Sequence, residues 1–305
     1  MKKIPVPRLA AGPSRLFHRS LVTLDVEGDS VRLLAVKGRQ IIAWELDPLE
    51  TGLVREGVVA DPQAVGAQIK SLLAGCRVRN GRLVTSLTGQ RSVPRILDLP
   101  ETNSQQLQAM LPREMKRELP VPLEEMYLSY QVIGSEDGHC RVFVLAVPRD
   151  VLGPQLEAIE HAGRKPYAMD IKPLALVRAV GLSDALIADL EPESIDIVVV
   201  RGGVPATIRT VGLQPQGGEI EDKIRRLGEE LTRTVKFYND THPEPLAKST
   251  PLCLTGTLAE EVALSGVAEA SVGLTLEPLS PPLDCPPSLP VATFMVNIGL
   301  ALKEV

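Results

Sequence analysis

Two stretches of this 305-residue chain share one nine-residue pattern. Residues 25–33 and 189–197 both read Asp, apolar, Glu, any residue, an acid, Ser, apolar, any residue, apolar. Each stretch predicts a β-hairpin, because an apolar strand enters an acidic turn and a second apolar strand leaves it. The copies start 164 residues apart, at Asp25 and Asp189, so the chain is predicted to contain two related halves. One such hairpin alone would carry little weight, since these are common turn residues.

Composition argues against several classes of function. The chain is 44% hydrophobic and long enough for two domains, so it can bury a substantial core. A net charge of −5, scattered Lys and Arg residues and only 3% aromatic residues argue against binding of nucleic acid. The four Cys and four His residues are far apart, which predicts neither a metal site nor a disulfide framework. We therefore expect a globular protein of a reducing compartment.

The N-terminal residues of the chain differ in composition from the rest. Residues 1–18 are rich in Lys, Arg and Pro and are predicted to form a flexible basic tail. No apolar segment follows them, so they do not resemble a secretory signal. Weak contact with an anionic membrane face is the alternative role. No apolar run in the chain approaches the roughly 20 residues that span a bilayer, so we expect a soluble protein.

The first half of the chain predicts one β-rich unit with a block inserted in it. After the hairpin, residues 41–46 and 82–87 are predicted strands, and Asp61 is predicted to cap a helix that ends at Gly75. Residues from about 93 to 165 predict a β-α-β-β-α block. Within that block, Pro112 is expected to kink or shorten its helix, and Asp150 is expected to cap the last helix.

The second half predicts a similar unit with a long helix. The expected elements are strands at 185–190, 195–200 and 204–210, a helix at 219–239, a strand at 251–255, a helix from about Leu258, a loop at 278–290 and a last helix at about 290–303.

The family resemblance is carried by several short stretches. They are Val-Arg-Glu-Gly-Val-Val at 54–59 with Asp61-Pro62, Pro-Val-Pro-Leu-Glu-Glu at 120–125 followed by Tyr-Gln-Val at 130–132, Ala-Val-Pro-Arg at 146–149, and Ala162-Gly163 with Pro166 and Asp170. Over residues 19–303 the chain resembles PilM, the cytoplasmic actin-like protein of type IV pilus assembly and a relative of the cell-division protein FtsA.

The resemblance implies an α/β, actin-like duplicated fold with two lobes and an inserted subdomain of the FtsA and PilM type. It divides the chain into the basic tail (1–18), a first subdomain (19–92 plus 166–182), an inserted subdomain (93–165), a second actin-like subdomain (183–212 plus 250–305) and a reduced helical subdomain (213–249). The two hairpin turns would face each other across a cleft that holds nucleotide phosphates in relatives.

The same resemblance names the residues that would bind a nucleotide. They are Asp25, Gly28, Ser30, Asp189 and Gly256, with Asp25 and Asp189 near a Mg²⁺ ion. The turns depart from the family pattern, because Pro192 has no N–H to donate and acidic residues flank both turns.

Up to four carboxylates, those of Glu27, Asp29, Glu191 and Glu193, would face the phosphates. A like-charge pair about 4 Å apart costs roughly 4 kcal/mol at an effective dielectric near 20. We therefore expect a degenerate cleft without a cofactor, a metal or catalytic residues, with ATP and Mg²⁺ as the alternative.

These features favour a non-catalytic scaffold at the cytoplasmic side of the inner membrane. The resemblance implies a PilN-like partner whose N-terminal segment docks in a groove between the first and inserted subdomains, so that membrane contact is indirect. The expected contacts are Arg91, Val93, Arg95 and Leu97, although Val93 and Leu97 also suit an ordinary sheet core. Self-association is left open. The alternatives are an ATP-binding switch or ATPase of the same fold, a cytoplasmic component of type II secretion, and an FtsA-like filament protein.

Overall fold

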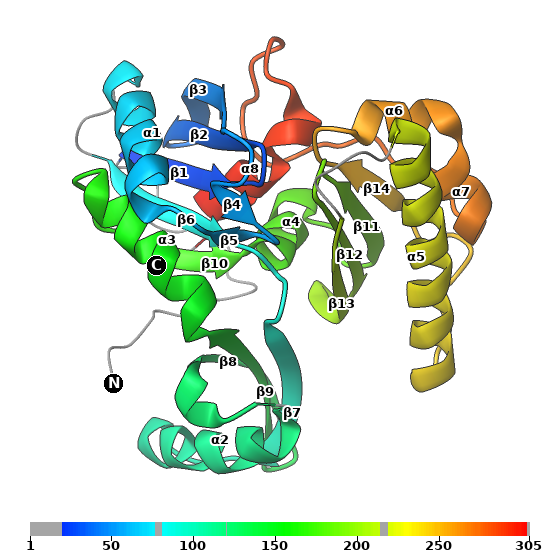
Figure 1. The fold of residues 1–305 in the computed structure, drawn as a ribbon. Coiled ribbons are helices and arrows are strands. Elements are labelled where there is room, and N and C mark those ends of the chain that lie inside the picture. The colour runs from blue at the N-terminus through cyan, green and yellow to red at the C-terminus, as the bar shows by residue number, and fades with distance from the viewer. Residues whose placement is uncertain (1–19, 77–80, 120, 214–218, 304–305) are drawn as a thin grey trace.

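Two β-sheets of matching construction form the two lobes of the protein (Figure 1). A computed structural model describes residues 20–76, 81–119, 121–213 and 219–303, so the predicted basic tail at 1–18 lies outside the described residues. The first sheet has the order β10-β6-β1-β2-β3, with β1 (Ser20–Val26), β2 (Ser30–Lys37), β3 (Gln40–Pro48), β6 (Arg82–Leu87) and β10 (Ala168–Ile171). The second has the order β13-β12-β11-β14, with β11 (Ala185–Leu190), β12 (Ser194–Arg201), β13 (Val204–Gly212) and β14 (Leu252–Thr255).

The predicted duplication is confirmed by the pairing of these strands. In the first sheet, β1 pairs antiparallel with β2 and parallel with β6. In the second sheet, β11 pairs antiparallel with β12 and parallel with β14. Both hairpins also continue into a third antiparallel strand, β3 or β13. Each sheet is therefore the same arrangement of four strands, and β10 extends only the first.

Helices cover both faces of the first sheet, which explains why β1 and β2 are almost entirely buried. On one face, Val22 and Leu33 pack against α1 (Pro62–Gly75) and α3 (Arg149–His161). On the other face, Leu21 and Leu34 pack against α4 (Lys172–Val180) and α8 (Met295–Ala301). The short strands β4 (Val54–Arg55) and β5 (Val58–Val59) form a separate ribbon before α1.

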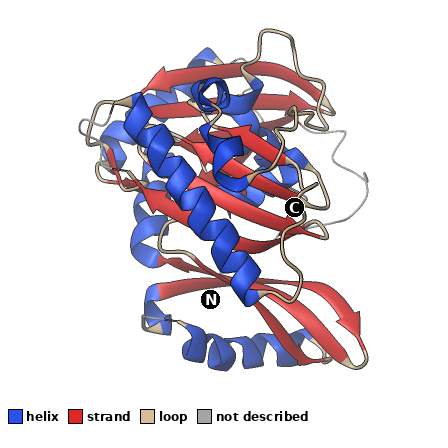
Figure 2. Ribbon diagram, turned by 90° about the vertical axis from the view of Figure 1, so that its right-hand side faces the viewer, coloured by secondary structure: helices blue, strands red, loops and turns tan. Residues whose placement is uncertain are grey.

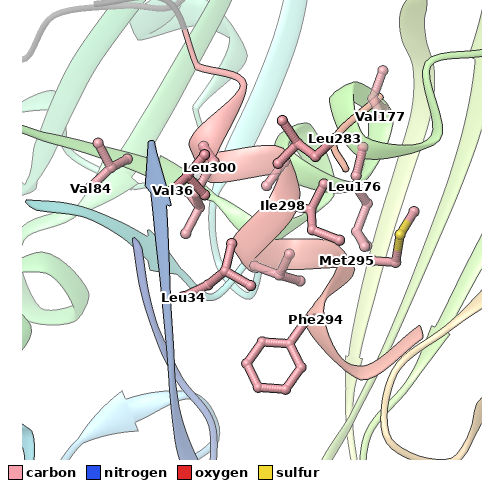
Figure 3. Packing of buried hydrophobic residues seen from close by; sticks show 14 of the residues in the cluster. Leu34, Val36, Val84, Leu176, Val177, Leu283, Phe294, Met295, Ile298 and Leu300 are labelled. Atoms are coloured by element: carbon pink, nitrogen blue, oxygen red, sulfur yellow. The ribbon is translucent and has the colours of Figure 1, made fainter. Parts of the chain in front are cut away.

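Helices α4 and α8 join the two lobes. Their core includes Leu34 of the first sheet and Ile187 of the second. Figure 3 shows Ile298 and Leu300 of α8 between Leu34 of β2 and Leu176 of α4. A Cβ atom on Gly299 would lie 1.8 Å from the Ala175 carbonyl oxygen, so only glycine permits this close approach of α8 to α4.

A third, smaller sheet lies below the first lobe (Figures 1 and 2). Its order is β7-β9-β8, with β7 (Val93–Pro100), β8 (Met126–Glu136) and β9 (His139–Pro148). Helix α2 (Ser104–Glu118) covers one face through Leu107, Leu111 and Met115. The short 3-10 helix η2 (Leu123–Glu125) precedes β8. We call these elements the inserted sheet.

Pro112 does not shorten its helix, because α2 continues through it to Glu118 while Leu111 and Met115 stay buried on either side, and the alternative of a kink stays a prediction. The prediction for Asp150 is wrong. Asp150 does not cap α3. That helix begins after Pro148 without a side-chain cap, and the Asp150 carboxylate pairs instead with Arg91.

The second lobe carries most of the remaining helices. Helix α5 (Ile220–Thr241) packs its apolar stripe on the second sheet, together with α6 (Ala259–Ser265) and α7 (Val267–Val272). The last predicted helix divides into a 3-10 turn, η3 (Val291–Phe294), and α8. Within the described part of the chain, no helix is both long and apolar enough to cross a membrane. The subdomain boundaries given above stay a prediction.

Candidate functional site

The turns of the two repeated hairpins lie in contact with each other. Each turn is closed by its own backbone hydrogen bond, from Glu27 N to Ser30 O at 2.8 Å and from Glu191 N to Ser194 O at 2.9 Å. A Cβ atom on Gly28 would lie 1.9 Å from Oε2 of Glu193, so the Glu193 side chain packs directly on the first turn. Glycine at position 28 therefore makes room for an acidic side chain of the opposite hairpin.

The aspartates that end the first strand of each hairpin have matching partners. Ser86 of β6 donates to Asp25 at 2.5 Å, and Thr255 of β14 donates to Asp189 at 2.7 Å. In both lobes the hydroxyl comes from the parallel neighbour strand, as the duplication requires. Gly256 follows Thr255, with φ at +98°, and a Cβ atom there would lie 2.3 Å from the Leu190 carbonyl oxygen. The structure thus brings the predicted residues Asp25, Asp189 and Gly256 to one region.

Arg32 of β2 links the first hairpin to the second. Its Nη1 and Nη2 atoms lie 2.7 and 2.6 Å from the two carboxylate oxygens of Glu191, a two-pronged pair. Nη1 also lies 3.5 Å from Oδ2 of Asp25. The Arg32 and Asp25 side chains are 0% exposed. A buried guanidinium therefore connects both lobes.

Lys172, the first residue of α4, makes the second link. Its Nζ atom lies 2.6 Å from Glu27, 3.5 Å from Asp189 and 3.4 Å from Asp196. Glu27 belongs to the first hairpin, whereas Asp189 and Asp196 belong to the second. All four side chains are buried. We call Asp25, Glu27, Arg32, Lys172, Asp189, Glu191 and Asp196 the buried ion network.

Acidic groups outnumber basic groups in the buried ion network, and this shifts their protonation. Burial raises the pKa of Glu27, and Lys172 opposes that shift only in part. Burial also raises the pKa of Asp189 to about 7, against the attraction of Lys172. Burial would raise the pKa of Glu191 too, but the charge and hydrogen bonds of Arg32 hold it below its ordinary value. Of these three carboxylates, Glu191 is thus the one that the network holds in its ionised form.

Sequence reasoning missed the cations of this network. It expected carboxylates at the two turns that would repel phosphates, whereas Arg32 and Lys172 pair directly with two of them, Glu191 and Glu27. A signal was present, because Arg32 interrupts an apolar strand and Lys172 follows a short apolar strand. Of the predicted residues, Ser30 bonds to Asp29 in its own turn. Among the described residues, no group of three or more His, Cys, Asp or Glu side chains is arranged to hold a metal ion.

A separate groove lies where the inserted sheet meets α3. We call it the junction groove; it has a volume of about 560 Å³ and is lined by Arg91, Val93, Val121, Met126, Pro148 and Asp150, among others. Val93, Val121, Met126 and Pro148 make an apolar wall, and the Arg91–Asp150 ion pair, at 2.7 Å, lies at its rim. Because α3 packs on α1, this groove lies between the first lobe and the inserted sheet.

The four residues expected to bind a partner do not lie together. A spacing of four residues would place Arg91 and Arg95 on one face of a strand. Strand β7 begins at Val93, however, so Arg91 lies before it, in a turn with φ at +59°, and shares no strand face with Arg95. Arg95 pairs with Glu118 of α2 at 3.1 Å and lies outside the junction groove. Leu97 packs in the core of the inserted sheet, the alternative role noted from the sequence. Val93 packs there too and also lines the groove.

Comparisons with known proteins point to one family. The model of the family described as type IV pilus assembly protein PilM matches residues 24–212. The structure of a PilM-PilN type IV pilus biogenesis complex matches with a TM-score of 0.77 and 24% identity, covering 92% of this chain and 97% of that chain.

Other solved structures share the fold at lower identity. The ethanolamine utilization protein EutJ from Carboxydothermus hydrogenoformans has a TM-score of 0.54 and 12% identity, covering 98% of this chain and 93% of that chain. The cytoplasmic domain of EpsL, from the type II secretion system of Vibrio cholerae, has a TM-score of 0.54 and 14% identity, covering 94% and 96%. No curated protein sequence matches the chain. These likenesses show an actin-like α/β fold.

Proposed function

This chain belongs to the PilM family of type IV pilus assembly proteins, and on that basis we propose that it is a non-catalytic scaffold that docks the N-terminal segment of a PilN-like inner-membrane protein. The observation that carries the proposal is the junction groove, which lies where the sequence resemblance expects the partner segment. The solved PilM-PilN complex supports the choice of partner, since its PilM is similar in fold over 92% of this chain. The scaffold is cytoplasmic and meets the membrane through that partner.

The lining of the junction groove suits an extended, mainly apolar peptide. Its wall is apolar, so burial of the peptide's alternate side chains against it contributes affinity. The rim carries Arg91 and Asp150, which can bind polar groups of the peptide backbone or side chains. Val121 is 41% exposed on this wall, so its side chain is accessible to a peptide in the groove.

Degeneracy of the nucleotide cleft is the second part of the proposal. The residues at the cleft do not fit a nucleotide with Mg²⁺. Both terminal nitrogens of Arg32 already donate hydrogen bonds to Glu191, and the Glu193 side chain occupies the space beside Gly28. Phosphates placed between the hairpins would also meet Glu27 and Asp189 in a buried setting. Side-chain cations, instead of a ligand, then hold the two hairpins together.

The docking proposal is tested with a synthetic peptide of a PilN-like N-terminus. Val121→Asp should weaken binding about tenfold or more, equivalent to about 1.4 kcal/mol, because it places a charge on the apolar wall. Val132→Asp is the matched control, since Val132 is 43% exposed on β8 of the same sheet and lies outside the groove. Fluorescence anisotropy gives both affinities. Equal affinities in two well-folded variants would remove the junction groove from the binding site.

The two arginines near β7 give a second comparison. Arg91→Glu should weaken the same peptide, because Arg91 lines the junction groove, whereas Arg95→Glu should leave its affinity unchanged. Both arginines are exposed and each pairs with one exposed carboxylate, so the two changes should alter stability by similar small amounts. A loss of affinity with Arg95→Glu but not with Arg91→Glu would place the peptide elsewhere on β7.

A further inference from the structure

Three arginines surround one buried carboxylate on the second lobe. Glu230 of α5 is 0% exposed, and it accepts hydrogen bonds from Arg209 of β13 at 2.6 and 2.7 Å. Arg226 and Arg233, one turn to either side along α5, each lie 2.9 Å from its other oxygen. We call Arg209, Arg226, Arg233 and Glu230 the arginine cluster. One carboxylate cannot balance three guanidinium groups, so the cluster keeps an excess of positive charge.

The excess charge faces solvent in a fixed arrangement. The three arginine side chains are 43%, 41% and 55% exposed. Arg226 also lies 3.4 Å from Glu229, which Arg225 shares at 2.8 Å, and Arg225 pairs with Asp222 at 3.1 Å as well. With these neighbours included, four guanidinium groups meet three carboxylates, so one positive charge remains in excess. Because Glu230 holds the guanidinium groups in place, less side-chain entropy is lost when they bind an anion. Their planar, forked donors match the two oxygens of a carboxylate.

The cluster adjoins an apolar groove. Phe237 lies one turn beyond Arg233 on α5 and is 58% exposed. It lines a groove of about 600 Å³ together with Ile96 of β7 and Ile208 of β13, which we call the strand-edge groove. Figures 1 and 2 show the C-terminal end of α5 on the side of the second lobe that faces the inserted sheet, and residues of both line this groove. Anion-binding and apolar surfaces are therefore continuous.

Two unpaired strand edges border this groove. Strand β7 is the outer strand of the inserted sheet, and β13 is the outer strand of the second sheet. Within the described residues, each has no strand on its outer side, so an incoming extended segment can pair with its backbone N–H and C=O groups. Pro94 and Pro205 lie near the starts of these strands, so the later residues of each offer the continuous edge.

We propose that this face binds an extended segment of a second partner protein, with acidic side chains on the arginine cluster and an apolar side chain beside Phe237. Charge complementarity selects an acidic segment. A narrow segment fits better than a flat anionic membrane, because a segment can enter the strand-edge groove and pair with the strand edges that border it, which a flat surface cannot reach. This surface is distinct from the junction groove and does not depend on the PilN-like partner.

The test uses phage-displayed random peptides selected on the whole protein. Peptides that combine Asp or Glu with a large apolar residue should be enriched, and their synthetic forms should bind more weakly as salt is raised. The variant Arg226→Gln/Arg233→Gln should weaken them at least tenfold. It keeps both contacts of Arg209 with Oε2 of Glu230, so the buried carboxylate retains a cationic partner.

Matched variants separate this face from others. Phe237→Ser should weaken the selected peptides, whereas Leu264→Ser, at a residue 82% exposed on α6, should not. Val121→Asp, in the junction groove, should also leave their affinity unchanged. The proposal is overturned by the absence of acidic enrichment, by equal binding to the arginine variant, or by binding of phosphatidylserine vesicles through these arginines without any selected peptide.

Discussion

At the scale of single residues, the two hairpins differ most at one equivalent position. Arg32 lies opposite Asp25 in the first hairpin, and Asp196 lies opposite Asp189 in the second. The first pair is attractive, whereas the second places two buried acids side by side. In the second hairpin, Lys172 of α4 pairs with both acids. Arg32 of the first hairpin also pairs with Glu191 of the second. The arginine that distinguishes the first repeat from the second therefore forms an ion pair between the two lobes.

Removal of the Arg32 charge should destabilise the protein strongly. Arg32→Met leaves Glu191 and Asp25 buried without their cation, and we expect a loss of about 3–5 kcal/mol in unfolding free energy. Arg32→Met/Glu191→Gln should cost clearly less than the sum of the single changes, because it removes both charges of the pair. Urea denaturation measures all three. As a control, Arg91→Met breaks an exposed pair and should cost under about 1 kcal/mol. Equal losses for the two arginines would contradict the role of the buried pair.

The protonation of Asp189 should make stability depend on pH. Its pKa is raised from 3.8 to about 7, so the folded protein holds a proton that the unfolded chain releases. This contribution to stability is complete below the unfolded value and is lost as the pH rises toward 7.

Asp189→Asn removes the titratable group, and the oxygen of the asparagine side chain can still accept the hydrogen bond from the Thr255 hydroxyl. Between pH 5 and pH 8, the unfolding free energy of this variant should therefore rise by on the order of 2 kcal/mol relative to that of the wild type, because only the wild type loses the contribution of Asp189. The unfolding free energy at the two pH values is the measurement. The exposed Asp240→Asn serves as the control and should show no such gain. A constant difference between Asp189→Asn and the wild type would show that Asp189 is ionised throughout.

At the scale of helices and strands, local patterns predicted most elements. Asp61 caps α1 through the Gln63 and Ala64 N–H groups, as its position before a proline indicated. The strand at 82–87 has the predicted bounds, and α5 begins and ends within two residues of its prediction. These signals lie within a few neighbouring residues, so the sequence alone contains them. The cap of α3 failed because Asp150 has a competing partner 59 residues away.

The candidate sites depend on contacts that sequence patterns do not contain. Arg32 and Glu191 are 159 residues apart, and their pairing follows only once the two lobes are placed together. The hairpin repeat predicted which turns would meet, but not which side chains would neutralise them. Likewise, the spacing of Arg91 and Arg95 is that of residues on one strand face. Because Arg91 lies in a turn, however, it lines the junction groove, whereas Arg95 lines the strand-edge groove. Tertiary packing, and not local sequence preference, therefore determines which side chains meet in the buried ion network and which line the junction groove.

At the scale of the whole molecule, the lobes are joined by an apolar core and by the buried ion network. Helices α4 and α8 supply the core, and Arg32 and Lys172 bridge the hairpins beside it. Because side chains of the protein itself link the lobes, we propose that no nucleotide is needed to hold them in this arrangement. The junction groove lies on the other side of the first lobe's sheet from α4 and α8, beside α3. We therefore expect partner docking to be independent of ATP.

Calorimetric titration of a PilN-like N-terminal peptide into the full chain, without and with ATP and Mg²⁺, tests this expectation. We predict saturable binding of the peptide, the same Kd within about twofold when ATP is present, and no thermal stabilisation by ATP alone, since ligand binding would raise stability by RT ln(1 + [L]/Kd). Absence of peptide binding by the folded protein would contradict the scaffold role. Tight ATP binding that changes the peptide's Kd would contradict the degenerate cleft and point to a nucleotide switch.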